Sequence, residues 1–152
     1  MRIRVQPEPF DLGREIADLV GTRRDLGAQV SFTGLVRDDN GLEALEIEHY
    51  PGMTEKALNA IASEAETRWD LGAVLVIHRY GRLMPGDAIM MVATAAKHRR
   101  AAFAAAEFLM DFLKSRAPFW KREITGTAAA WVDAKATDEA VLNRWKDPNA
   151  TS

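Results

Sequence analysis

The sequence predicts an α+β fold, and three observations lead to that class. Apolar residues recur at helical spacing in residues 10–20, 52–69 and 98–116, whereas other segments alternate or run apolar in the manner of strands. Turn-forming residues separate these segments, but helices and strands do not alternate regularly as they would in a parallel α/β sheet. The 152 residues contain no repeat or long linker. We therefore expect one domain over residues 1–152, with a disordered tail from about residue 146.

The first third of the chain predicts one helix and a hairpin. The segment FDLGREIADLV begins with Asp11 as a possible N-cap and places four apolar residues on one helical face: Leu12, Ile16, Leu19 and Val20. Residues 28–37, AQVSFTGLVR, and residues 42–50, LEALEIEHY, alternate as strands do. The segment between them, RDDNG, is rich in turn formers, so we expect these two strands to pair with each other.

The remainder predicts two further helices, three strands and a short final helix. Residues 52–69 and 98–116 are helical, and the second of these, which Pro118 follows, has the clearest apolar face in the chain. Residues 73–81 and 88–96 are apolar strands joined by the turn LMPGD. The strand EITGTAAAWV and the short helix TDEAVLNRW are expected to close the fold.

Composition excludes several classes of function. A formal net charge of −2 argues against a dedicated nucleic-acid binder, and no segment has the apolar length of a membrane span or signal peptide. A cytoplasmic protein is therefore expected. The absence of cysteine excludes disulfides, thiolate nucleophiles, iron–sulfur clusters and cysteine-ligated zinc. The three histidines show no metal-ligand spacing, and His49 and His78 fall in strands where a structural role is expected. We predict no metal and no cofactor.

Positive charge gathers in residues 97–123 of this slightly acidic chain. The segment KHRR, residues 97–100, stands at the predicted start of the long helix, where free backbone N–H groups and the helix dipole favour an anion. Basic side chains at that position oppose the dipole unless an anion lies between them. The conflict indicates a phosphate or carboxylate site, and the alternative is a solvated basic patch.

Two lysines bracket the aromatic run in LKSRAPFWKRE, residues 113–123. The chain must turn at Pro118 and return, so Lys114 and Lys121 can face the same hollow. Two neighbouring ammonium groups lower each other's pKa, which suits proton transfer or carboxylate binding. In the alternative interpretation, Trp120 anchors the core and both lysines extend outward into solvent. Arg37, at the end of the first predicted strand, is a third candidate for the hollow.

Five segments, taken together and in this order, resemble the large, catalytic subunit family of molybdopterin synthase. The resemblance runs from about Phe10 to Trp145 and rests on FTGLVR (32–37), EHYPGMTEKAL (48–58), HRYGRLMPGD (78–87), KHRRAAFAAAEFLMDFLKSRAPFWKRE (97–123) and WVDAK (131–135). It implies an α/β hammerhead fold with an additional antiparallel sheet. It also implies a central homodimer that carries one small subunit at each end, giving a heterotetramer.

The resemblance implies a reaction as well. Members of the family convert cyclic pyranopterin monophosphate to molybdopterin by installing two sulfur atoms as a dithiolene and opening the cyclic phosphate. The sulfur arrives as the C-terminal Gly-Gly thiocarboxylate of a small ubiquitin-like subunit. The absence of cysteine agrees with this, because a sulfur-transferring chain without cysteine must receive its sulfur on another molecule.

The same resemblance identifies the site residues. Lys114 and Lys121 match the two catalytic lysines; Lys114 is expected to transfer a proton or capture the thiocarboxylate, and Lys121 to orient substrate and stabilise negative charge. The implied substrate-binding set is Leu35, Val36, Arg37, His98, Arg99, Arg122, Glu123 and Lys135. His98 and Arg99 are expected to hold the substrate phosphate, and Arg37 to close the pocket. Lys135 is expected to reach the neighbouring subunit's site.

Two other classes of function remain open at this point. The chain can be a non-catalytic homologue that only scaffolds the small sulfur-carrier subunit. It can also be a single-strand nucleic-acid binder that stacks bases on Phe119 and Trp120. The presence of both lysines argues against the first alternative, and the overall acidity argues against the second.

Overall fold

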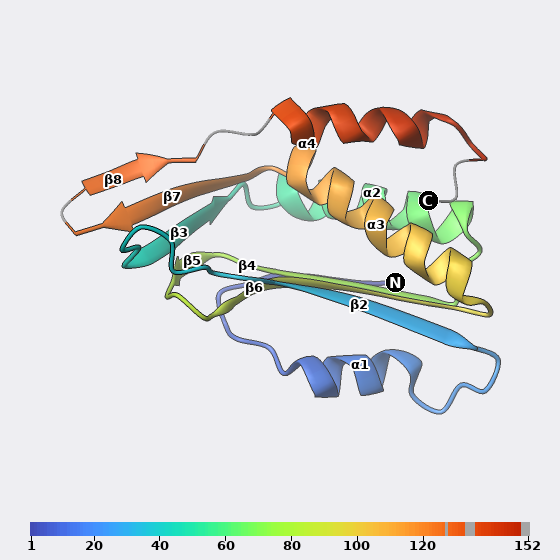
Figure 1. Ribbon diagram of the computed structural model, residues 1–152. Helices are drawn as coiled ribbons and strands as arrows, with labels where there is room; N and C mark the ends of the chain where they lie inside the picture. The colour runs from blue at the N-terminus through green and yellow to red at the C-terminus, as the bar shows by residue number, and fades with distance from the viewer. Residues whose placement is uncertain (127, 133–135, 150–152) are drawn as a thin grey trace.

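The computed structural model describes residues 1–126, 128–132 and 136–149 and confirms the α+β class (Figure 1). Two four-stranded sheets contain the strands β1 (Arg2–Gln6), β2 (Ala28–Leu35), β3 (Ala44–His49), β4 (Ala73–Arg79), β5 (Gly81–Leu83), β6 (Ala88–Ala96), β7 (Phe119–Thr125) and β8 (Ala128–Trp131). The helices are α1 (Leu12–Val20), α2 (Met53–Arg68), α3 (Arg99–Ser115), α4 (Ala136–Ala140) and the 3-10 turn η1 (Val141–Lys146). Within the described residues, no helix combines the length and apolar character needed to cross a membrane.

The first sheet, with strand order β1-β4-β6-β2, is covered on both faces (Figure 1). Helix α1 lies on one face, where Leu19 packs in a cluster with Leu75 and Ile77. Helices α2 and α3 cover the other face and form the larger core, in which Phe108 is completely buried. Burial on both faces explains why β4 reads as a continuous apolar run rather than an alternating one.

The second sheet, with order β5-β3-β7-β8, extends beyond the helical layer in Figure 1. Leu45 and Ile47 of β3 pack with Leu83 and Val36 in a small separate core. Strands β7 and β8 form an antiparallel hairpin, and Gly126 lies in its turn with φ of 59°, a conformation that glycine adopts without strain. This sheet carries β7, and therefore Lys121, directly after helix α3.

The prediction that the strands at residues 28–37 and 42–50 pair as a hairpin is wrong. Strand β2 pairs with β6 in the first sheet, whereas β3 pairs with β5 and β7 in the second. The turn formers of residues 37–41 carry the chain between the two sheets instead of closing a ladder. The physical reason is that each strand has its own apolar partner: Val30 packs against the large core, and Ile47 packs in the small one.

The structure corrects three further sequence predictions. Residues 123–132 are not one strand, because β7 already begins at Phe119 and the chain reverses at Gly126. The sequence did not predict strand β1, which pairs in parallel with β4, because its arginines lower the apolar character of the segment. The final helix is a short α-helix that continues as the 3-10 turn η1.

Candidate active site

Lys114 and Lys121 lie on either side of a tight connection between α3 and β7. Lys114 is exposed in the last turn of α3, where the free carbonyl groups of the helix favour a cation. At the end of the helix, the N–H of Arg116 donates to the carbonyl oxygen of Phe112 at 2.7 Å. In the connection that follows, the N–H of Phe119 donates to the carbonyl oxygen of Ala117 at 2.9 Å. Two residues later Lys121 projects, partly buried, from the second sheet opposite Ile47.

The positive charge of Lys114 acts on Lys121 through space. The pKa of Lys121 is lowered, first because the side chain is largely buried and second because the positive charge of Lys114 is close. Asp138, on α4, opposes this shift. A lysine with a lowered pKa releases its proton more readily and is more often present as a free amine. The charge of Lys114 is therefore close enough to act on Lys121, whereas the shared hollow that both lysines are expected to face stays a prediction.

Phe119, rather than Trp120, is the aromatic side chain that anchors this connection. Its ring stacks on the buried ring of His78 with a centroid distance of 3.7 Å and an interplanar angle of 17°. Trp120 is 48% exposed and lies on the opposite side of β7. The alternative in which Trp120 anchors the core is therefore wrong, and of the two lysines that it directs outward only Lys114 is exposed, whereas Lys121 is partly buried.

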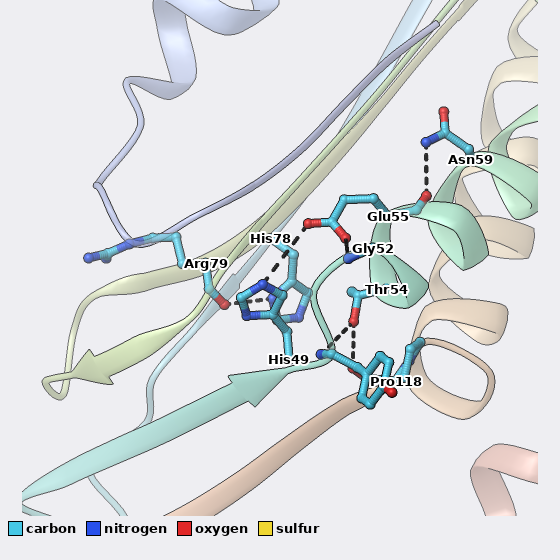
Figure 2. A network of polar contacts seen from close by, with 9 residues as sticks. His49, Gly52, Thr54, Glu55, Asn59, His78, Arg79 and Pro118 are labelled. Atoms are coloured by element: carbon cyan, nitrogen blue, oxygen red, sulfur yellow. Dashed lines mark hydrogen bonds and ion pairs between the residues drawn. The ribbon is translucent and has the colours of Figure 1, made fainter.

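His78 is held as a neutral ring. Burial lowers its pKa from 6.5 to about 3, and the nearby charge of Lys121 acts in the same direction. Its Nδ1 lies 2.8 Å from the carbonyl oxygen of Arg79, which can only accept, so Nδ1 carries the proton and donates (Figure 2). The ring of His49 packs at a tilt of 34° against that of Tyr80 with 4.2 Å between the centroids, and its Nε2 is 4.0 Å from a carboxylate oxygen of Glu55. Both histidines have the structural contacts that were expected.

Arg122 and Glu123 follow Lys121 on β7 but face opposite sides of the sheet. Arg122 forms an ion pair with Glu46 of β3, which raises the pKa of Arg122 and lowers that of Glu46. Its guanidinium also lies 5.4 Å from the ring centroid of Trp131. Glu123 is exposed on the same side as Lys121, because side chains alternate along a strand. Arg122 is thus already engaged on the far side of the sheet from Lys121.

The end of β2 supplies one buried and two exposed candidates. Val36 is buried, and its backbone N–H and carbonyl bind the carbonyl of Asp87 and the N–H of Gly86. Leu35 is 58% exposed. Arg37 is also exposed and forms an ion pair with Asp39 at 3.2 Å. Val36 therefore anchors this segment, which presents Leu35 and Arg37 to solvent.

The structure places His98 and Arg99 far from the lysines. His98 is the N-cap of α3 without a side-chain capping bond, and Arg99 is the first helical residue. Fifteen residues separate Arg99 from Lys114 along one helix, which corresponds to about 22 Å at 1.5 Å per residue. One chain therefore does not bring the proposed phosphate-binding residues to the lysine pair. Lys135 lies outside the described residues.

Sequence reasoning did not identify the residues that support the lysines. Thr54 is fully buried, and its hydroxyl donates to the carbonyl of Pro118 at 2.9 Å (Figure 2). A threonine in the first turn of a helix has many ordinary roles, so the sequence carries no signal for this contact. Asp138 was also missed, because only the packing of α4 against α3 brings it toward Lys121.

Comparison with known proteins places this geometry in context. The family model described as MoaE protein matches residues 5–116. The chain is 64% identical over 146 residues to the molybdopterin synthase catalytic subunit of Cereibacter sphaeroides, covering 95% of this chain and 100% of the relative.

Solved structures give the same result. The MoaE protein of Burkholderia ambifaria superposes with a TM-score of 0.84 at 53% identity, covering 96% of this chain and 98% of that one. The molybdopterin synthase of Staphylococcus aureus superposes with a TM-score of 0.78 at 30% identity, covering 85% of this chain and 95% of that one.

Proposed function

The chain belongs to the MoaE family, and on that premise we propose that it is the sulfur-transferring, catalytic component of a molybdopterin synthase. It would convert cyclic pyranopterin monophosphate to molybdopterin, using sulfur from the C-terminal thiocarboxylate of a small ubiquitin-like subunit. The observation that carries the proposal is the lysine pair. A partly buried Lys121 with a lowered pKa lies close to the exposed Lys114. Lys114 is in the last turn of α3 and Lys121 is near the start of β7, so the short connection between these two elements brings them close.

The burial of Lys121 supports a division of roles opposite to the one expected from the sequence. Lys121 has the lowered pKa, so we assign to it the proton transfer or covalent capture at the thiocarboxylate. Lys114 is exposed at the end of α3, where its side chain can bind the thiocarboxylate of the small subunit and stabilise developing negative charge. Glu123 lies on the same side of β7 as Lys121 and borders the site.

A complete site then requires two copies of the chain. His98 and Arg99 stand about one helix length from Lys114, at a helix start that favours an anion. In the homodimer that the family resemblance implies, the start of α3 in one copy can meet the lysines of the other. We propose that the substrate phosphate binds to His98 and Arg99 of one copy while Lys114 and Lys121 of the other act on it. Leu35, Arg37 and Lys135 remain proposed contributors.

The proposal also covers partner, compartment and domain organisation. The chain has no cysteine, so the sulfur must be delivered by a second molecule, and the Gly-Gly tail of the small subunit suits a site lined by two lysines. A cytoplasmic location and a single domain over residues 1–152 remain predictions. Arg68 binds the carbonyls of Trp145, at 2.7 Å, and of Asp147, so the chain is attached to the large core as far as residue 147.

The two alternative functions are less well supported. Of the two rings proposed to stack bases, Phe119 is already stacked against His78, so only the exposed Trp120 is open to a base. A purely scaffolding role would give no reason for a buried lysine next to a second lysine, since burying an ammonium group lowers stability.

The test is an assay of the purified chain with cyclic pyranopterin monophosphate. We expect dithiolene product when the thiocarboxylated small subunit is added and none with free sulfide at physiological concentration. The Lys121→Ala variant, still bound to the partner, is the control for contaminating enzyme. Product without any partner would contradict the sulfur-delivery mechanism, and equal product from the variant would contradict the role of the lysine.

A further inference from the structure

We propose that Thr54 and His78 are positioning residues for Lys121: they hold Pro118 and Phe119 so that β7 begins with Lys121 directed toward Lys114. The inference rests on the proposed function only in giving Lys121 a catalytic task. The positioning itself is a statement about contacts within this chain. It concerns two groups of contacts at the start of β7: the hydrogen bonds of Thr54 on α2 to backbone groups that follow β3 and precede β7 (Figure 2), and the stacking of His78 of β4 on Phe119.

Thr54 fixes the backbone of the connection. Its Oγ1 accepts from the N–H of Tyr50 at 2.9 Å and donates to the carbonyl of Pro118 at 2.9 Å. Because the hydroxyl has one proton and two lone pairs, it satisfies both backbone groups at once. Thr54 has no exposed surface, so water cannot replace it without opening the core. The residue therefore joins the end of β3 to the residue before β7.

His78 fixes the next side chain. Its ring lies flat on Phe119, and the donation from Nδ1 to the carbonyl of Arg79 sets the plane of that ring. Arg79 is itself held, since its guanidinium donates to the carbonyls of Pro7 and Ala88. A neutral, hydrogen-bonded histidine is a rigid surface against which Phe119 can pack. An imidazolium at this position would repel the ammonium of Lys121.

Together these contacts set the direction of Lys121. Phe119 and Lys121 are two residues apart on one strand, so their side chains project to the same side of the sheet. With Pro118 and Phe119 held, Lys121 has little freedom to swing out of its partly buried position. The charged groups that act on Lys121 in this position are Lys114 of α3 and Asp138 of α4. The neutral ring of His78 on β4 is also close to Lys121, and His49 of β3 is close to His78.

The test is the pKa of Lys121 measured by NMR titration of its ¹³Cε signal, which a Lys121→Arg sample identifies. Thr54→Val keeps the size of the side chain but leaves the carbonyl of Pro118 and the N–H of Tyr50 without this partner. We expect the pKa of Lys121 to rise toward that of an exposed lysine, and kcat in the complete synthase to fall by about 10-fold or more with little change in KM. Thr54→Ser, which retains the hydroxyl, should restore both values.

Thr94→Val is the matched control. Thr94 is also fully buried, and its hydroxyl donates to the carbonyl of Ala102 at 2.7 Å, near the opposite end of α3. This variant should lose thermal stability as Thr54→Val does but leave the pKa of Lys121 unchanged. If both variants shift that pKa equally, general loosening of the core explains the effect and the proposal fails.

A second variant covers the case in which Thr54→Val does not fold. His78→Leu removes the flat ring beneath Phe119 and should raise the pKa of Lys121 in the same direction. A folded Thr54→Val or His78→Leu protein with the wild-type pKa of Lys121 would overturn the proposal. The titration needs no turnover, so a shifted pKa in a protein that proves inactive with every substrate would support the positioning and refute the proposed function.

Discussion

Both ends of helix α3 carry basic side chains, but the helix dipole favours those at the C-terminal end and opposes those at the N-terminal end. At the C-terminal end the helix dipole favours Lys114, and packing buries the neighbouring Lys121. At the N-terminal end His98 and Arg99 are exposed, no acidic residue lies in the first turn, and the dipole opposes them. Among the residues that the structure describes, no carboxylate forms an ion pair with Arg99. The C-terminal end is therefore organised by the chain itself, and the N-terminal end is suited to an anion from outside it.

The largest expected effect is at the C-terminal end. Lys121→Ala or Lys114→Ala should lower turnover by about 10²–10⁴-fold, the range for a positioned proton-transfer group. Binding of the small subunit should remain largely intact, because one side chain is a small part of that interface. The double variant should be scarcely worse than either single one, since groups that act as a unit are non-additive. Single-turnover rates and partner titrations give these quantities.

Arg116→Ala is the control for the lysine variants. Arg116 is exposed and forms an ion pair with Glu139 at 2.6 Å, so it has the charge of Lys114 and lies two residues from it, but it is not among the charges that shift the pKa of Lys121. The turnover rate of the Arg116→Ala variant should stay near that of the unmodified chain. Similar losses in Arg116→Ala and Lys114→Ala would mean that general positive charge, and not a directed lysine pair, supports the reaction.

The next largest effect is at the N-terminal end. Arg99→Ala should weaken substrate binding by about 1.5–3 kcal/mol, which is the range for a hydrogen bond to a charged group. Thermal stability should not change, because the side chain is exposed. Calorimetric titration with the substrate and a melting curve measure the two quantities. Unchanged affinity in a stable variant would place the phosphate elsewhere.

A smaller effect is expected on stability against acid. His78 has a pKa of 6.5 in an unfolded chain and about 3 in the fold, so between these values the unfolded chain binds a proton that the folded one does not. The free energy of unfolding should thus fall as pH drops below 6.5, by up to about 1.4 kcal/mol per pH unit from this group. His78→Phe should show a shallower decline in urea unfolding series at pH 7 and pH 5. Equal declines would show that the ring is not buried neutral.

The smallest effect separates the two causes of the Lys121 shift. Lys114→Ala removes a neighbouring positive charge, so the pKa of Lys121 should rise in NMR titration. It should not return fully to the value of an exposed lysine, because burial is the larger cause and remains. A pKa that does not move would mean that the two ammonium groups do not share one site.

The sequence predicted the elements of the lysine site better than their connections. The apolar face of α3 and the turn at Pro118 follow from local periodicity and proline geometry, and they are enough to return Lys121 toward Lys114. Strand pairing is not local. The assignment of β2 and β3 to different sheets depends on which core each strand packs against, and the alternation of either strand is compatible with a hairpin.

The supporting contacts could not be predicted for a similar reason. Thr54 and Pro118 are 64 residues apart, and His78 reaches Phe119 only after two sheets have formed. The separation of Arg99 from Lys114 was in principle readable from the sequence, since both lie on one predicted helix. The family resemblance grouped them in one pocket, and the helical rise shows that a single chain cannot do so.

The most direct test of the central claim is complementation between two impaired variants, assayed at a substrate concentration so low that the Arg99→Ala chain binds almost no substrate. If one site takes Arg99 from one copy and the lysines from the other, then mixing Arg99→Ala with Lys114→Ala chains forms mixed dimers in which one of the two sites is intact. After dissociation and reassembly of equal amounts with the small subunit, activity should return to about a quarter of the wild-type value, because about half of the dimers are mixed and each has one working site. Activity that stays at the level of the separate variants, although mixed dimers are present, would contradict a site shared between two chains.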